Sequence, residues 1–592
     1  MRLLAPILLL LALMLGALWM DRAAPRADIV IANSAETFTL DPQRLSYQHD
    51  VRTSRALFEG LTAVDGTTGQ VIPAAATKWS VSDDGCTWTF DLRSDLRWSD
   101  GVPLTSHDFV YAWRRALLPD LAADYAGFFL NIRGAREFFA WRSKALGEFP
   151  KTGGQNLATA LWNETEQKFA STVGLSAPND HTLVVVLARP VAYWLDLCAF
   201  PAMFPVPQHL VEQFTSISAQ TGMVQQNSGW TKAGVLVGNG PYTLAAWRPK
   251  RLMRFERNTL YRDAEHIAAN AIETLPIEDP NTAVLAFESG AVDWLTDTLV
   301  EYRGDMFEQT KHGQRSNLHV LDAFGTDFFS LNCRPTLADG RTNPFAHAGV
   351  RRAFAMAVDK QTMIDRITRL GESVATTLIP PGSIAGYHGP NGLPFDPTRA
   401  KQELEQAGWH LVNGVVQNEQ GEAFPTVEVL YAANSPRYRD MSSAMADMWQ
   451  RTLGVQCTTR SRDPSGYKDS LKRGDFMIAR GGWYGDYGDP TTWLDLARSD
   501  DGNNDRKYAN PKYDALLDQA AAELDPTKRF AMLAEAERML MDQDIPVIPI
   551  CHYVTVYMYE PDRLTGISRH PRLEQYLGRL GIVNAASAPS VR

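Results

Sequence analysis

The sequence has few cysteines and lacks the motifs in which cysteine usually binds metal. Five cysteines are spread over 592 residues, and no CxxC pair occurs, which argues against a zinc or iron–sulfur site. Because their number is odd, at least one thiol is unpaired unless it bonds another chain. One or two disulfides remain open, and burial as small apolar side chains is the favoured interpretation. We expect no metal and no cofactor.

Clusters of positive charge are also lacking. The chain has 58 Lys and Arg against 68 Asp and Glu, a formal net charge of −10, and without a Lys/Arg-rich run nucleic acid is a poor candidate partner. The composition, with 45% hydrophobic and 21% charged residues, is ordinary for a globular protein. The length exceeds what one hydrophobic core usually supports, so two to four structural units are expected.

The standard catalytic motifs are missing as well. The sequence contains no HExxH, no GxSxG, no Walker loop and no Rossmann glycine pattern after a strand. The stretch GNGP (238–241) is too short for a phosphate loop, and SDDGNNDRKY (499–508) does not have the oxygen spacing of a calcium loop. These absences argue against an enzyme.

The N-terminus carries one long apolar run. Arg2 is followed by eighteen residues without a charge, from Leu3 to Met20, which is typical of an export signal. The run just reaches the length needed to span a bilayer, and no small-x-small cleavage site stands out. Residues 1–24 are therefore predicted to be a cleaved signal peptide or an uncleaved membrane anchor, with the rest of the chain outside the cytoplasm.

The order of local patterns predicts an α/β protein. The segment CTWTFDLR alternates like a half-buried strand, and Thr105 or Ser106 can cap the helix that follows. Residues 238–261 favour a β-hairpin, whereas 136–170 are mixed and indicate a surface excursion. Apolar positions from Val350 to Ile367 share one helical face. In the second half, strands and helices alternate, which indicates a layered sheet.

One stretch, ARGGWYGDYGDPTTWLDL (479–496), crowds rings, glycines and aspartates together. Asp486 and Asp489 could form an acid pair, as in glycosidases or acid proteases. Alternatively, rings at Trp483, Tyr484 and Tyr487 exclude water around Asp486, so that its carboxylate attracts an ammonium group. A cap of the next turn is the favoured interpretation for Asp489 and a weaker one for Asp486.

Several segments together resemble the solute-binding proteins of peptide ABC importers, the oligopeptide- and dipeptide-binding family. The longest is AAATKWSVSDDGCTWTFDLRSDLRWSDGVPLTSHDFVYAWRR (74–115). The other matching segments fall in the same order as in the family. Along the chain they are LDP (40–42), LFEGL (57–61), GNGPYTLAAW (238–247), VRRAFAMAVDK (350–360), GWYGDYGDP (482–490), and YANPKYDALL through DIPVIPI (508–550). These matches span residues 35 to 555, nearly all of the exported part.

The resemblance implies a two-lobe clamshell of the periplasmic-binding-protein kind, type II and cluster C-like. Lobe I would comprise 28–58, 185–325 and 554–592, with an additional subdomain at 59–184, and lobe II would comprise 326–553. Two strands would join the lobes, with hinge candidates near 325–329 and 551–553, and closure would bury the ligand. Such proteins hold an extended peptide by main-chain hydrogen bonds.

The resemblance also implies roles for individual residues. Asp486 matches an aspartate that pairs with the peptide α-ammonium, and Arg480 matches an arginine that meets the peptide carboxylate. The other expected ligand contacts are Gly482, Trp483, Tyr484, Tyr487, Tyr125 and Gln48. Where some relatives have a cysteine this chain has Tyr484, so no disulfide is expected there.

The resulting expectation is a monomeric periplasmic receptor that captures peptides and delivers them to membrane permease subunits of an ABC importer. Two alternatives stay open. The same fold could bind a non-peptide solute such as an oligosaccharide, or Asp486 and Asp489 could serve an extracytoplasmic hydrolase. Fold alone does not decide between them.

Overall fold

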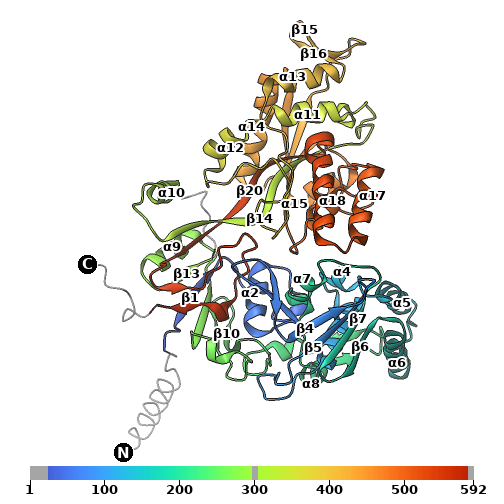
Figure 1. Ribbon diagram of the computed structural model, residues 1–592, viewed down its shortest axis with the longest axis vertical. Coiled ribbons are helices and arrows are strands. Elements are labelled where there is room, and N and C mark those ends of the chain that lie inside the picture. Colours follow the sequence, from blue (N-terminus) through green and yellow to red (C-terminus); the bar gives the residue numbers. More distant parts are fainter. Residues whose placement is uncertain (1–24, 297–303, 584–592) are drawn as a thin grey trace, which may run out of the picture.

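In the computed structural model, which describes residues 25–296 and 304–583, two bodies are joined by a pair of long strands (Figure 1). These strands are β14 (Leu318–Leu331) and β20 (Val547–Tyr559), which pair antiparallel. They belong to a ten-stranded sheet of order β10-β11-β12-β1-β13-β20-β14-β19-β17-β18. We call the body containing β1 lobe I and the body containing β17 lobe II. The predicted signal or anchor at 1–24 lies outside the described residues.

Lobe I is built on one half of this sheet. Its strands are β1 (Ile29–Asn33), β10 (Tyr242–Arg248), β11 (Leu252–Arg257), β12 (Ala271–Pro276) and β13 (Trp294–Leu295). The predicted hairpin at 238–261 is the β10–β11 pair. Its helices include α2 (Gln48–Leu57), α7 (Trp194–Cys198), α8 (Gln208–Val211), α9 (Pro280–Glu288) and α10 (Gly304–Lys311).

A second sheet of order β4-β5-β7-β6 extends lobe I. Its strands are β4 (Ala76–Val81), β5 (Thr87–Leu92), β6 (Leu175–Asn179) and β7 (Thr182–Val186), with helices α3 (Ser106–Leu117), α4 (Ala126–Phe129), α5 (Ala135–Gly147) and α6 (Gln155–Thr172). Thr105 caps α3 in a capping box with Asp108. One continuous apolar core joins this sheet to lobe I.

Lobe II contains β17 (Val427–Ala432), β18 (Cys457–Arg462) and β19 (Ile478–Tyr484). The helices packed around them are α11 (Ala348–Met356), α12 (Lys360–Met363), α13 (Pro397–Gln406), α14 (Pro436–Leu453), α15 (Pro464–Arg473), α16 (Thr491–Leu494), α17 (Pro511–Ala522) and α18 (Pro526–Arg538). A hairpin of β15 (Trp409–Val412) and β16 (Val415–Asn418) projects from its far end (Figure 1). Its apolar clusters are separate from those of lobe I.

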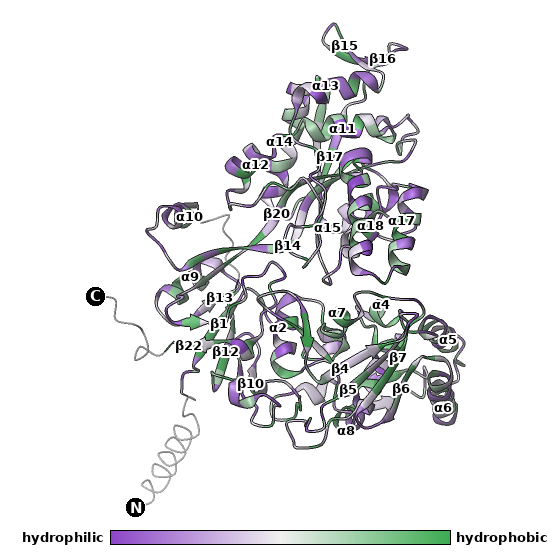
Figure 2. Ribbon diagram, in the orientation of Figure 1, coloured by the Kyte–Doolittle hydropathy of each residue, from purple (hydrophilic) through white to green (hydrophobic). Residues whose placement is uncertain are grey.

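Shorter hairpins complete the chain: β2 (Thr62–Val64) with β3 (Val71–Pro73), β8 (Thr215–Ile217) with β9 (Val224–Gln226), and β21 (Leu564–Thr565) with β22 (Gly581–Ile582). Figure 2 shows hydrophobic residues along strands such as β1 and β7 and hydrophilic ones on outer helices such as α13. Within the described residues, no helix is both long and apolar enough to cross a membrane.

The junction between the lobes is marked by an irregularity in strand pairing. On β14 and β20, Asp322 pairs with Val554, but the next pair is Thr326 with His552. The ladder is thus interrupted around residues 323–325, and such bulges bend a strand. The interruption lies beside both segments that the sequence offers as hinge candidates.

Two local expectations differ from the structure. The apolar face from Val350 to Ile367 predicts one helix, but the chain forms α11 and α12, because the side chain of Asp359 accepts a hydrogen bond from Thr362 N at 3.0 Å and starts a new helix. The mixed segment 136–170 consists mostly of α5 and α6. Only three residues of α6 are buried, which explains the weak apolar pattern.

Candidate ligand-binding site

A cavity of about 540 Å³ lies between the lobes, next to the hinge strands. Lobe I and its extension contribute Ser46, Tyr47, Gln48, His49, Arg55, Tyr125 and Phe200; lobe II contributes Tyr484, Gly485 and Asp486; the hinge strands contribute Ala323, Phe324, Val554 and Thr555; and the C-terminal loop contributes Arg572, Leu573 and Glu574. Both lobes therefore supply polar side chains to one space, as a ligand that bridges them requires.

Asp486 lies where β19 ends, on a loop held to the hinge by Gly485 N, which donates to Phe324 O at 2.8 Å. The backbone N–H of Asp486 donates to Thr492 Oγ1 at 3.0 Å, which fixes the loop from the other side. Its carboxylate forms no ion pair with any residue that the structure describes. It faces the cavity, yet desolvation by the surrounding protein raises the pKa of Asp486 to about 6.

Aromatic rings line the cavity near Asp486, whose side chain is itself exposed to the solvent in the cavity. Tyr484 is 58% exposed, and its ring stacks on Tyr553 with centroids 4.7 Å apart. Across the cleft, Tyr125 and Phe200 pack with centroids 4.6 Å apart. Burial raises the pKa of Tyr125 to about 12, and the negative charge of Asp486 adds to the shift. An ammonium group beside Asp486 would thus lie among rings, which also attract cations.

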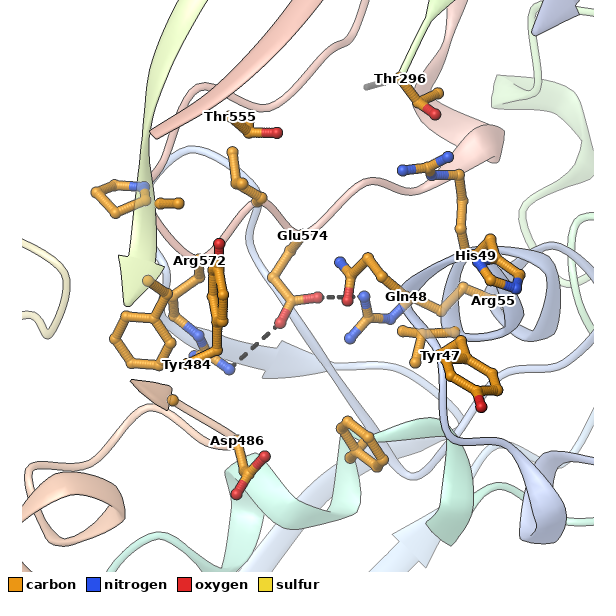
Figure 3. A pocket seen from close by; sticks show the side chains of 18 of the residues that line it. Tyr47, Gln48, His49, Arg55, Thr296, Tyr484, Asp486, Thr555, Arg572 and Glu574 are labelled. Carbon is orange, nitrogen blue, oxygen red and sulfur yellow. Dashed lines mark hydrogen bonds and ion pairs between the residues drawn. The ribbon is translucent and has the colours of Figure 1, made fainter. Parts of the chain in front are cut away.

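The opposite wall carries charges that already compensate one another. Glu574 lies between Arg55, with which it forms an ion pair, and Arg572, whose Nη2 is 3.4 Å from Glu574 Oε1 (Figure 3). Arg572 also forms two hydrogen bonds with Asp196, of 2.7 and 2.9 Å. Glu574 and Asp196 thus compensate the guanidinium groups of Arg55 and Arg572, whereas no ion pair compensates Asp486 among the described residues.

The structure brings together four of the eight residues selected from the sequence: Gln48, Tyr125, Tyr484 and Asp486 line the cavity. The other four do not line it. Arg480 pairs with Asp327 at 2.8 Å, and a Cβ on Gly482 would lie 2.1 Å from Tyr553 Oη. Trp483 packs on the core of lobe II, and Tyr487 stacks on Tyr193. Strand geometry explains only Trp483, because Trp483 and Tyr484 point to opposite faces of β19. Arg480 and Gly482 share the face of Tyr484, but Tyr553 lies over both, and Arg480 Nη2 donates to Tyr553 Oη at 2.7 Å.

Several lining residues carry no sequence motif. Arg572 and Glu574 come from a C-terminal loop more than 500 positions away from Arg55 in the chain. His49 stacks on Tyr47 at 5.6 Å, and burial lowers its pKa. For this wall of the cavity the sequence offered one signal, Gln48, which the family resemblance places among the ligand contacts.

The residues that the structure describes contain no group of three His, Cys, Asp or Glu side chains arranged to hold a metal ion. The five cysteines are all unpaired, including the two that are fully buried, Cys198 and Cys551.

Two lobes with separate cores, a two-strand hinge and a polar cavity between them define a solute-binding protein of the clamshell type. Residues 70–505 match the bacterial extracellular solute-binding proteins, family 5. This match covers most of the chain, and the protein belongs to that family.

Individual relatives agree with this assignment. The probable deoxycholate-binding periplasmic protein YgiS of Escherichia coli K12 is 29% identical over 551 residues, covering 91% of this chain and 90% of the relative. Among solved structures, the unliganded open form of the periplasmic murein tripeptide-binding protein MppA has a TM-score of 0.77 at 27% identity, covering 95% and 99%. Haemophilus influenzae OppA in complex with the peptide RPPGFSPFR has a TM-score of 0.66 at 28% identity, covering 95% and 100%.

Proposed function

We propose that this protein is the periplasmic receptor of an ABC importer, and that it captures peptides between its lobes through their free amino end. The observation that carries the proposal is the carboxylate of Asp486, which lines the inter-lobe cavity without an ion-pair partner among the described residues. A partly desolvated carboxylate stabilises an ammonium ligand far more than a neutral one. Relatives whose names specify peptides support this choice.

The backbone of β19 supports a peptide rather than a single amino acid. Along one edge β19 pairs with β14 from Ile478 to Tyr484, but along the other it pairs with β17 only at Ile478 and Ala479. Within the described residues no strand pairs with this second edge at 481–483, Tyr467 Oη donates to Arg480 O just before it, and the edge leads toward Asp486. An extended chain anchored at Asp486 could add along this edge by main-chain hydrogen bonds, which tolerate any side chain.

The protein is proposed to act as a monomer by capture and release, without chemistry. A hydrolytic acid pair would need both aspartates in one cavity. Asp489 instead accepts two hydrogen bonds from Arg529, of 2.6 and 2.9 Å, and faces a different cavity. Closure of the lobes would bury the ligand and present a surface to the permease subunits.

Binding to Asp486→Asn tests the proposal directly. Removing one partner of a buried charge pair costs about 2–5 kcal/mol, so a free-amine peptide should bind at least about thirtyfold more weakly. The exposed Asp500→Asn is the matched control and should bind as wild type does. Native mass spectrometry of the wild-type protein as purified would identify retained ligand. A neutral oligosaccharide as the retained ligand, with unchanged affinity in Asp486→Asn, would refute the peptide proposal and support the sugar alternative.

A further inference from the structure

A second cavity, of about 660 Å³, lies on the other side of the loop that carries Asp486. Gly485 and Asp486 line the first cavity, whereas Gly488 and Asp489 line the second. In Figure 1, the lobe I surface marked by α7 faces α17 and α18 of lobe II, and both sides contribute to the wall of this cavity. Small-molecule sites in proteins usually have volumes of about 300–1,000 Å³, so the space is large enough to be one.

Side chains of the two lobes contact each other next to this cavity. The ring of Tyr487 stacks on Tyr193 of lobe I, with centroids 4.2 Å apart. At another point of the wall, Leu524 of lobe II lies over Gly85 of lobe I, where an added Cβ would be 2.8 Å from Leu524 Cδ2. A molecule in this space would therefore contact both lobes at once.

The wall is formed largely by apolar side chains. Lobe I contributes Val81, Trp88 and Val191, and lobe II contributes Ile384, Leu524 and Phe530. Val81 and Leu524 are 46% and 55% exposed, so they remain available to contact a ligand. An apolar ligand would remove part of this surface from water, which is a main source of affinity in sites of this kind.

The charged side chains of the wall are already paired. Asp489 accepts hydrogen bonds of 2.6 and 2.9 Å from Arg529, and Asp196 accepts hydrogen bonds of 2.7 and 2.9 Å from Arg572. The remaining charged residue among the described residues of the wall is Glu523, whose carboxylate accepts a solvent-exposed hydrogen bond from the backbone N–H of Asp525 at 2.8 Å. A charged group of a ligand would thus leave water without gaining an unpaired buried partner, which is unfavourable.

We propose that the second cavity is a separate binding site for small, uncharged, apolar molecules. The first cavity presents the carboxylate of Asp486 to a cationic group, whereas the second presents rings and aliphatic side chains together with charges that are already paired. The site goes beyond the proposed capture of peptides and does not depend on it, because Asp486 lies outside its wall. A ligand bound here joins lobe I to lobe II through the same contacts that hold it.

Two fluorescent probes with the same ring system test the chemistry of the site. N-phenyl-1-naphthylamine is uncharged, and 1-anilinonaphthalene-8-sulfonate carries one sulfonate on the same rings. The uncharged probe should bind at one site per protein with a Kd of about 10 µM or tighter. The sulfonate should bind at least about tenfold more weakly, because the wall offers it no unpaired cation. Fluorescence titration measures both Kd values.

Two substitutions fill the cavity from opposite lobes. Ala521→Trp in α17 and Ala192→Trp in lobe I each place a ring in the space. Ala522→Trp is the matched control, because Ala522 is the next residue of α17, is exposed and does not line the cavity. Ala192 is exposed and Ala521 is half-buried, so the folded state should tolerate either ring. Thermal unfolding checks that each variant is folded.

Each filling variant should bind N-phenyl-1-naphthylamine at least about tenfold more weakly than the wild type, whereas Ala522→Trp and Asp486→Asn should stay within about twofold of it. No binding to the wild type, or unchanged binding in a folded filling variant, would overturn the assignment of the site. Weaker binding in Asp486→Asn would place the probe in the first cavity and overturn it too. A sulfonate that binds as tightly as the uncharged probe would refute the selection for uncharged ligands. The effect of Asp486→Asn on peptide affinity decides the proposed function and leaves this site unaffected.

Discussion

The raised pKa of Asp486 predicts that affinity for amine ligands falls in weak acid. Asp486 must be ionised to pair with an ammonium group, and its pKa in the ligand-free protein is about 6. A peptide α-amine, with an ordinary pKa of about 8, stays charged below pH 7. Any loss of affinity between pH 7 and pH 5 therefore reports the carboxylate rather than the ligand.

The magnitude follows from the fraction ionised. With a pKa of about 6, roughly nine-tenths of the protein carries the Asp486 charge at pH 7 and roughly one-tenth at pH 5. If the bound ammonium lowers the pKa below about 4, the affinity should fall about tenfold between these values, equivalent to about 1.4 kcal/mol. At pH 6, binding should release about half a proton per ligand.

Isothermal titration calorimetry at pH 5, 6 and 7, in two buffers of different ionisation enthalpy, measures both quantities. Asp486→Asn should bind weakly with an affinity that hardly depends on pH in this range. An affinity of the wild-type protein that is constant from pH 7 to pH 5, or no proton release at pH 6, would refute the raised pKa of Asp486. Binding of free-amine peptides to Asp486→Asn as tight as to the wild type would refute the pairing with an ammonium group.

Three further predictions concern the scaffold. Gly482→Ala should lower the melting temperature, because its Cβ would lie 2.1 Å from Tyr553 Oη. Overpacking of this kind costs about 1–3 kcal/mol of stability. Adding Tyr553→Phe to the Gly482→Ala protein should restore part of the loss. Burial lowers the pKa of Lys360 to about 7, so the chain takes up a proton when it unfolds between pH 7 and 10. The free energy of unfolding in urea should therefore rise with pH in this window, and Lys360→Met should flatten the rise. Asp489→Asn should reduce the free energy of unfolding in urea by about 3–5 kcal/mol, because it breaks a buried pair with Arg529; a loss below about 1 kcal/mol would contradict this reasoning.

Features set by short stretches of sequence could be predicted. The Thr105 cap, the β10–β11 hairpin and the alternation of strands and helices all follow from residues close together in the chain. Asp486 could also be selected, because the loop around it combines glycines and rings with an aspartate for which a cap role was the weaker interpretation. The two-lobe arrangement itself came from the order of several family-like segments, since no local pattern specifies how halves of a sheet join.

The remaining site residues depend on contacts distant in sequence. Arg480 looks available for a ligand carboxylate until the structure places Asp327 beside it, 153 positions earlier. The neighbouring glycines disfavour a strand, so the alternation that turns Trp483 away from Tyr484 was hidden. The reason for a glycine here lies in a different strand, because a Cβ on Gly481 would lie 2.6 Å from the ring of Phe328 in β14.

Contacts between the lobes bear on how a ligand would be captured. The structure is more similar to an unliganded open relative, with a TM-score of 0.77, than to a peptide complex, with 0.66. Yet Tyr487 already contacts Tyr193 across the lobes, and Asp486 already faces Tyr125. A ligand shifts the equilibrium toward the closed state only by contacts that differ between the states. Under the proposed function, contacts that exist before the ligand binds, such as the Tyr193–Tyr487 stack, do not favour closure. The free energy that favours closure would then come from contacts of the bound peptide, including those with the wall formed by Arg55 and Glu574.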